Sequence, residues 1–383
     1  MTEPILAVDL AELRTRISAK WTAYDPDVIP AWVAEMDVIP AEPIRRALAD
    51  WMAKGDTGYP TSAGYVDAFG GFAERRWGWS IDGARARLAP DVMMGILVVL
   101  LKATSEGDAV VINDPVYPPF DSFPRLANRR VVRAALTDAG RLDLEALGAA
   151  FDQASEGGRR RSAYLLSNPH NPTGVVHTME ELTEVARLAD RHGVSVISDE
   201  VHAPVVYDGA RFVSYLQVPG LERGFAVHSA AKAFSLAALK AGLVLAAPGE
   251  DAVLAQIAQG PNASLSGVVT HTAAFTRCDD WLDQLLRELD TNRRLVLDLL
   301  AAHAPGITAA LPEATYLMWL DCRGAGLGDD PAAYLRDHAR VGLNSGPSFG
   351  PRGAGFARLN IATSPEILTE IVQRIGASLP PGQ

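Results

Sequence analysis

Short runs of apolar, largely β-branched residues recur along the middle of the 383-residue chain and constrain its fold more than any other feature. They are apolar along almost their whole length and do not alternate with polar residues, which is typical of strands buried on both faces of a sheet. Such runs occur at residues 109–112, 163–167, 194–198, 225–229 and 242–246. A sheet covered on both faces needs helices, so the pattern predicts an α/β fold with a mostly parallel sheet.

Helical patterns lie between these runs. In residues 179–192, Leu182 and Val185 follow helical spacing, and Thr178 with Glu181 forms a capping-box pattern at the start. In an alternating α/β sheet the ligand site lies beyond the carboxyl ends of the strands. Polar residues that directly follow the apolar runs are therefore the first candidates for function.

The two ends of the chain differ from this middle part. The first segment is broken by prolines and predicts an extended arm, whereas the last hundred residues combine a long helical pattern with strand-like residues 315–320 and 357–361. We expect an N-terminal arm (1–45) that joins a small α+β domain (284–383), and a large domain between them (46–283).

Composition and motifs exclude several kinds of partner. The net charge is −11 and no Lys/Arg-rich run is present, so we expect no nucleic acid partner. Cys278 and Cys322 lack the spacing of a zinc or redox motif, which fits a reducing cytoplasm. The first residues lack an export signal, and the longest uncharged apolar run, Val92 to Leu101, is about half of the ~20 residues that a membrane helix needs. We expect no membrane partner.

Polar segments follow three of the predicted strands: 168–174 (NPHNPTG), 199–202 (DEVH) and 229–232 (SAAK). A lysine at a strand end is partly desolvated, which lowers its pKa and suits it to Schiff-base chemistry. Asp199, one strand away, could keep a buried pyridinium nitrogen protonated. Taken singly, Lys232 is better explained as a solvated loop charge and Asp199 as a helix cap or a loop carboxylate, while a simple turn explains the Asn-Pro segment equally well.

Other motifs fail in their context. Ser229 to Lys232 matches the Ser-x-x-Lys motif of penicillin-binding proteins and class A β-lactamases, but their companion Ser-Asp-Asn and Lys-Thr-Gly triplets are missing. The chain also contains no GxGxxG and no GxxxxGK[ST] sequence, so dinucleotide and nucleotide loops are not predicted.

Taken together, the segments resemble the fold type I pyridoxal-phosphate (PLP) enzymes of the class I and II aminotransferase superfamily over nearly the whole chain. AWVAEMD (31–37), TGYP (57–60), DPVYPPF (114–120), SDEVHAP (198–204) and GFARLNIAT (355–363) are similar to the MalY/PatB branch of cystathionine β-lyases and cysteine C–S lyases. The resemblance implies the PLP-dependent transferase-like fold, in which a large domain holds a mostly parallel seven-stranded sheet and a smaller domain is α+β.

The resemblance also implies how PLP is held. Lys232 would bind the cofactor as a Schiff base and move the substrate's Cα proton, Asp199 would pair with the pyridinium nitrogen, and Asn171 would contact the ring 3-oxygen. His202 stands where many aminotransferases have a tyrosine, which favours lyase over transaminase. The remaining implied contacts are Ser229, Lys240 and the Gly95 and Ile96 amides to the phosphate, Tyr117 on the ring face, and Tyr59 from the other subunit of a homodimer.

For the substrate, the resemblance implies that Arg358 binds the α-carboxylate, because a guanidinium forms two parallel hydrogen bonds with a carboxylate. The arm would close over an amino-acid substrate, with Trp32 lining the pocket and Ala34 offering an amide. The implied activity is β-elimination from L-cystathionine or a related cysteine S-conjugate to a thiol, pyruvate and ammonia. An aminotransferase, or a lyase with an added regulatory partner, is the alternative.

Overall fold

The structure, a computed structural model, describes residues 3–62, 64–257 and 263–380. Its contacts divide the chain into two units. We call Pro40–His170 with Val175–Asp280 the large unit, and Met1–Ile39 with Asn171–Gly174 and Trp281–Gln383 the small unit. Domain boundaries at 45/46 and 283/284 stay predictions. The sequence pattern gave no sign that a four-residue piece of the NPHNPTG segment groups with the small unit.

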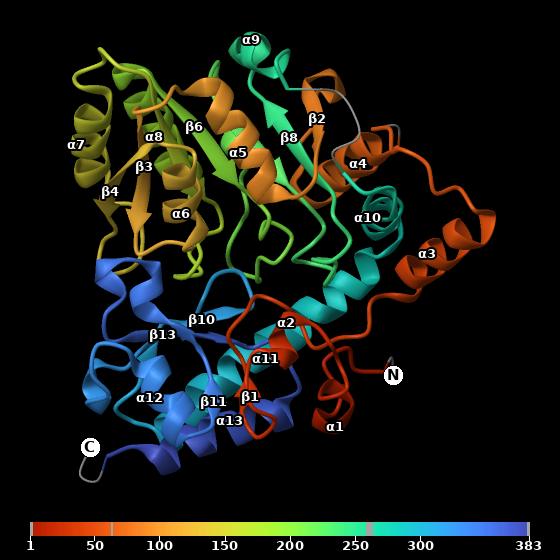
Figure 1. The fold of residues 1–383 in the computed structure, drawn as a ribbon, viewed down its shortest axis with the longest axis vertical. Helices are drawn as coiled ribbons and strands as arrows, with labels where there is room; N and C mark the ends of the chain where they lie inside the picture. Colours follow the sequence, from red (N-terminus) through yellow and green to blue (C-terminus); the bar gives the residue numbers. More distant parts are fainter. Residues whose placement is uncertain (1–2, 63, 258–262, 381–383) are drawn as a thin grey trace. The chain divides into compact units, whose positions relative to one another are not determined.

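The large unit is built on a seven-stranded sheet with the order β2-β8-β7-β6-β5-β3-β4 (Figure 1). β8 runs antiparallel to both of its neighbours, and the other neighbouring strands are parallel. The strands are β2 (Ala86–Ala89), β3 (Ala109–Asp114), β4 (Arg130–Ala135), β5 (Ser162–Ser167), β6 (Val194–Asp199), β7 (Phe225–His228) and β8 (Gly242–Ala246). The predicted mostly parallel α/β fold is confirmed, although the sequence analysis missed β2 and β4.

Helices cover both faces of this sheet. The large unit contains α3 (Glu42–Lys54), α4 (Tyr65–Trp77), α5 (Val92–Ala103), α6 (Pro119–Leu126), α7 (Leu144–Ser155), α8 (Met179–His192), α9 (Asp251–Leu254) and α10 (Leu265–Arg277). α5 and α6 lie on one face and α7 and α8 on the other (Figure 1). In the part of the chain that the structure describes, no helix is both long and apolar enough to cross a bilayer.

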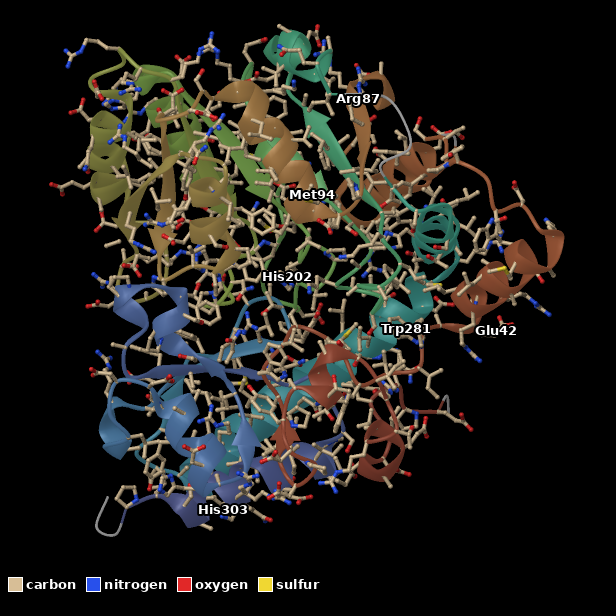
Figure 2. The ribbon with its side chains drawn as sticks, viewed as in Figure 1. Glu42, Arg87, Met94, His202, Trp281 and His303 are labelled. Carbon is tan, nitrogen blue, oxygen red and sulfur yellow. The ribbon has the colours of Figure 1, made fainter. Side chains whose placement is uncertain are left out.

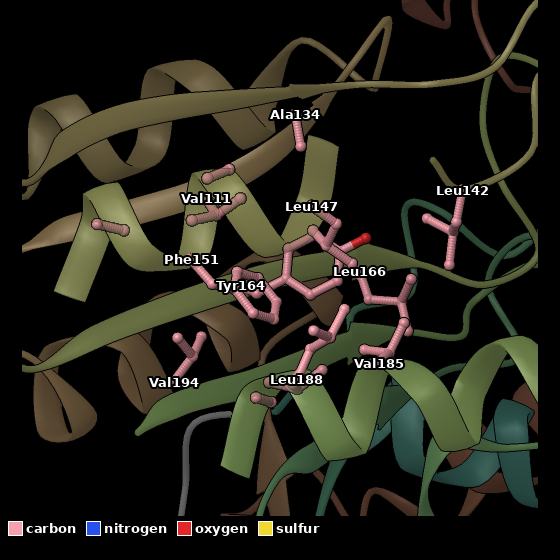
Figure 3. Packing of buried hydrophobic residues seen from close by; sticks show 14 of the residues in the cluster. Val111, Ala134, Leu142, Leu147, Phe151, Tyr164, Leu166, Val185, Leu188 and Val194 are labelled. Atoms are coloured by element: carbon pink, nitrogen blue, oxygen red, sulfur yellow. The ribbon is translucent and has the colours of Figure 1, made fainter. Parts of the chain in front are cut away.

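Successive strand residues face opposite sides of the sheet, so each face has its own apolar core. Val111, Tyr164 and Leu166 pack with α7 and α8 (Figure 3). Their neighbours Val110 and Leu165 belong to the core on the α5 and α6 side. This double burial explains why the strand sequences are apolar without alternation.

α8 begins and ends where its sequence signals stand. The Thr178 hydroxyl accepts a hydrogen bond from the Glu181 amide, and the Glu181 carboxylate accepts one from the Thr178 amide, which completes the predicted capping box. Gly193 closes the helix with a φ of 65°, in the left-handed region that favours glycine.

The small unit combines a four-stranded antiparallel sheet, β12-β13-β10-β9, with a parallel pair, β1-β11. Its strands are β1 (Ile29–Pro30), β9 (Thr308–Ala309), β10 (Leu317–Asp321), β11 (Val341–Gly342), β12 (Asn344–Ser345) and β13 (Phe356–Asn360). Its helices are α1 (Leu10–Leu13), α2 (Ala19–Thr22), α11 (Asp279–His303, whose first two residues belong to the large unit), α12 (Pro331–His338) and α13 (Pro365–Ser378). Through β1, the N-terminal arm is part of this unit's hydrogen-bonded structure.

Candidate functional site

Three neighbouring strands of the large sheet end at the same edge. Ser167 of β5 lies opposite Asp199 of β6, which lies opposite Val227 of β7. The ladder continues by one bond, because the Asn168 amide donates to the Asp199 carbonyl over 2.9 Å. The polar segments that follow these strands therefore start side by side, as the sequence analysis expected. Figure 2 shows His202 at this edge.

Asp199 is a buried carboxylate with 8% of its surface exposed. Burial raises its pKa to about 7, although the amide of Val201, 3.1 Å from one oxygen, and the nearby charge of Lys232 act in the opposite direction. A carboxylate this poorly solvated is stabilised as an anion by a further cationic hydrogen-bond donor. The protonated ring nitrogen of PLP is such a donor, so Asp199 fits the cofactor on its own chemistry.

A buried pair of side chains, Glu200 and His228, lies beside Asp199 and was missed by the sequence analysis. Glu200 and His228 place Oε2 and Nε2 2.8 Å apart, with side chains that are 0% and 2% exposed. The other Glu200 oxygen accepts hydrogen bonds from the Ser198 hydroxyl (2.9 Å) and the Tyr215 amide (2.8 Å). This contact joins the residue after β6 to the last residue of β7, next to Asp199 and to the segment that leads to Lys232.

Gly95 has a packing role on α5. A Cβ atom at this position would lie 3.0 Å from Val227 and 3.1 Å from Val244, which is closer than side chains normally approach. Its amide donates to the Asp91 carbonyl as the first bond of the helix, over 2.9 Å. That amide is therefore already engaged, and the phosphate contact of Gly95 and Ile96 stays a prediction.

Positive charge is present where a phosphate was expected. Lys240 lies 3.0 Å from the carboxylate of Asp91, and the same carboxylate caps the first turn of α5 by accepting from the Met94 amide over 2.9 Å. The Ser229 hydroxyl donates to the Ala241 carbonyl over 2.7 Å, so a bond to a phosphate requires the hydroxyl to rotate. Asp91 is an anion in this place that the sequence analysis did not consider.

The two tyrosines differ sharply in exposure. Tyr117 follows β3 and is partly buried at the start of α6, where its carbonyl accepts from the Phe120 amide over 2.9 Å. It belongs to the same edge of the sheet as Asp199. Tyr59 is 89% exposed, so most of its ring is open to solvent.

In the small unit, Arg358 is almost fully buried, with 2% of its surface exposed. Its Nη1 donates to Asn171 Oδ1 and its Nη2 to the Trp32 carbonyl, each over 2.9 Å, and the guanidinium lies 5.0 Å from the Phe349 ring centre. These two acceptors are neutral, and their bonds orient the guanidinium. A buried guanidinium held in this way suits an anionic ligand.

The predicted residues thus fall into two groups. The large unit holds Gly95, Ile96, Tyr117, Asp199, His202, Ser229, Lys232 and Lys240 around the strand ends and the start of α5, and it also holds the exposed Tyr59. The small unit holds Trp32, Ala34, Asn171 and Arg358. The Ala34 carbonyl accepts from the Tyr316 hydroxyl over 3.1 Å, and the role of its amide stays a prediction.

Comparison with known families gives one description for most of the chain. Residues 93–375 match the model of the family "Aminotransferase class I and II". The matched region includes all of the strand-end segments and Arg358.

Curated relatives and solved structures match over nearly the full length. The chain is 47% identical to a Mycobacterium tuberculosis protein provisionally named cystathionine beta-lyase, over 98% of each chain. It is 32% identical to the cystathionine beta-lyase of Corynebacterium glutamicum, over 97% of this chain and 99% of the relative. A crystal structure from Corynebacterium diphtheriae, provisionally described as a PLP-dependent beta-cystathionase, superposes with a TM-score of 0.91 at 30% identity over 98% of each chain.

Proposed function

Because the chain belongs to the aminotransferase class I and II family, we propose that it is a PLP-dependent carbon–sulfur β-lyase. Its substrate is L-cystathionine or a related cysteine S-conjugate, which it converts to a thiol, pyruvate and ammonia. The names of the full-length relatives support this activity. The observation that carries the proposal is Asp199, a buried carboxylate on the strand next to the one that leads into Lys232.

The residues of the large unit would hold the cofactor. Lys232 would bind it covalently, Asp199 would accept from its ring nitrogen, and His202 lies at the same edge. Tyr117 would stack on its ring. Asn171 of the small unit would bind the ring 3-oxygen, as the family resemblance implies.

The phosphate would lie at the start of α5. Lys240 supplies a positive charge, and Ser229 supplies a hydroxyl that now donates to a main-chain carbonyl. The amides of Val92 and Met93 precede that of Gly95 in the first turn, where the helix dipole favours an anion. We add these two amides to the predicted Gly95 and Ile96 contacts.

When bound, PLP acts as a sink for the electron pair that remains at Cα after proton removal. Asp199 keeps the ring nitrogen protonated, which maintains that capacity. Lys232 would be the base that takes the Cα proton of the substrate. The thiolate then leaves from Cβ, and the released product hydrolyses to pyruvate and ammonia. Arg358 binds the α-carboxylate and so orients the Cα–H bond.

Two further proposals complete this function. The protein acts as a homodimer, in which the exposed Tyr59 of each subunit reaches the cofactor phosphate of the other. It works in the cytoplasm, which is consistent with two buried, unpaired cysteines.

The test is to incubate the purified holoenzyme with L-cystathionine and no keto acid. The proposal expects pyruvate and a free thiol in equal amounts. Transamination needs a keto-acid acceptor and leaves the carbon–sulfur bond intact, so amino-group transfer to an added keto acid without release of a thiol would move the assignment to an aminotransferase.

A further inference from the structure

Four consecutive carbonyls of the N-terminal arm accept hydrogen bonds from side chains of the small unit. We call residues 32–35 the arm turn. The donors are Arg358 to Trp32 (2.9 Å), Asn360 to Val33 (2.8 Å), Tyr316 to Ala34 (3.1 Å), and Asn360 and Lys20 to Glu35 (2.7 and 3.2 Å). The arm turn lies outside the helices and strands, so side chains supply the bonds that a sheet or helix supplies elsewhere.

Asn360 supplies two of these bonds from one amide group. It lies on β13 two residues after Arg358, so both side chains project from the same face of the strand. Its side chain is buried, with 1% of the residue exposed, and its Oδ1 accepts from the Ala362 amide over 2.8 Å. Both amide hydrogens are therefore used for the arm turn, and the oxygen is used to hold the side chain in that orientation.

We propose that Asn360 is a positioning residue for recognition of the substrate carboxylate. It holds the arm turn so that the Trp32 carbonyl stays against Nη2 of Arg358, which fixes the plane of the guanidinium. This inference rests on the proposed role of Arg358 as the carboxylate-binding residue.

The geometry explains why the arm turn must be held. Asn171 Oδ1 and the Trp32 carbonyl bind the two terminal nitrogens of Arg358, and together they set its rotation. A carboxylate binds a guanidinium through two parallel bonds, so a rotated guanidinium presents the wrong edge. Without the Asn360 amide, the partly buried carbonyls of Val33 and Glu35 lose one donor each, and the arm turn holds the Trp32 carbonyl less firmly. Preorganisation of this kind affects binding of the group that Arg358 holds.

Asn292 on α11 offers a matched control. It is also 1% exposed, and its amide also donates to two main-chain carbonyls two residues apart, Ile361 (2.9 Å) and Thr363 (2.8 Å). Neither carbonyl belongs to the arm turn. Replacing Asn292 by alanine therefore removes the same chemistry from the same unit without releasing residues 32–35.

The experiment compares the holoenzymes of wild type, Asn360→Ala and Asn292→Ala. KM and kcat are measured with L-cystathionine, and binding of L-alanine and of ethylamine, which lacks the carboxylate, is followed by the change in cofactor absorbance. We expect Asn360→Ala to raise KM and the L-alanine dissociation constant roughly tenfold, with a smaller change in kcat and none in ethylamine binding. Asn292→Ala should lower the melting temperature to a similar extent and leave KM unchanged.

An unchanged KM in Asn360→Ala, an equal rise in both variants, or an equal loss of ethylamine binding would overturn the proposal. If Asn360→Ala does not fold, Tyr316→Phe removes one bond to the arm turn and should raise KM by about threefold. If wild type forms no pyruvate, the proposed lyase function fails, while the L-alanine and ethylamine measurements still test Asn360.

Discussion

The strand-end site of the large unit and the arm turn of the small unit hold their charged groups in opposite ways. Asp199 is placed by the register of regular strands, and burial raises its pKa to about 7, so a bound cationic donor would stabilise its charged form further. Arg358 is oriented by two neutral acceptors, the side-chain oxygen of Asn171 and the Trp32 carbonyl of the arm turn. The large unit thus holds a buried carboxylate whose charged form is poorly solvated, whereas the small unit holds a guanidinium whose orientation is set by hydrogen bonds.

The largest effect should come from removing the charge that meets the cofactor. Asp199→Asn keeps the shape but cannot hold the ring nitrogen protonated, so we expect kcat to fall on the order of 10² to 10³-fold, as for loss of other preorganised electrostatic groups. The rate of pyruvate formation at steady state measures this fall in kcat. Asp152→Asn, at a side chain that is 67% exposed, is the control and should retain full activity. An Asp199→Asn enzyme with wild-type kcat would remove Asp199 from the mechanism.

The raised pKa of Asp199 also predicts that the stability of the protein prepared without cofactor depends on pH. Its folded pKa of about 7 lies above the ordinary value of 3.8, so its protonated form stabilises the fold below about pH 4, and this stability is lost as the pH rises through about 7. Relative to wild type, Asp199→Asn should gain on the order of 3 to 4 kcal/mol in unfolding free energy between these pH values.

Urea unfolding of both proteins at a series of pH values measures this difference. Added cofactor should reduce the gain, because the ring nitrogen then pairs with the wild-type carboxylate. A difference between the two proteins that stays flat from pH 4 to 7 would show that Asp199 is not destabilised by burial.

Substrate binding at Arg358 should depend on the shape of the side chain as well as on its charge. Arg358→Lys keeps the positive charge but loses the planar pair of donors, so we expect kcat/KM for L-cystathionine to fall roughly 10²-fold, mostly through KM. Arg323→Lys, at a side chain that is 65% exposed, is the matched control. If Arg358→Lys binds substrate as wild type does, a point charge is sufficient and the orienting bonds are irrelevant.

The smallest predicted effect concerns how closely α5 approaches the sheet. Gly95→Ala would place a Cβ 3.0 Å from Val227, and we expect it to destabilise the protein by about 1 to 3 kcal/mol. Gly148→Ala on α7 would meet Leu188 at an ordinary 3.5 Å, and should stabilise by about 0.5 to 1 kcal/mol because alanine favours a helix. Thermal unfolding of the two variants measures both signs, and equal shifts would contradict the packing argument.

The sequence predicted the large unit better than the small one, for a physical reason. The apolar runs of β3, β5, β6, β7 and β8 are local patterns, and a polar residue that follows such a run must lie at the sheet edge. Asp199 and Lys232 were found in this way. β2 and β4 were missed because Ala86–Ala89 is short and Arg130–Ala135 carries charges at an exposed edge of the sheet.

The arm turn was out of reach of the same reasoning. Asn360 donates to carbonyls 325 and 327 residues away in the chain. Every residue has a main-chain carbonyl, so the residue type does not show which carbonyl accepts a bond from a distant side chain. Arg358 itself was identified through its family resemblance. Glu200 and His228 were missed because each stands beside a conspicuous residue and their pairing depends on the register of β6 and β7.

One measurement tests the central claim most directly: the absorbance spectrum of wild type and Lys232→Ala, recorded before and after L-cystathionine is added, with pyruvate assayed in the same sample and no keto acid present. The account predicts a visible cofactor band in wild type that changes with substrate while pyruvate forms, and the loss of both the covalent cofactor and pyruvate formation in the variant. A wild-type protein that shows no band even after PLP is added, or a Lys232→Ala protein that still forms pyruvate at the wild-type rate, would contradict it.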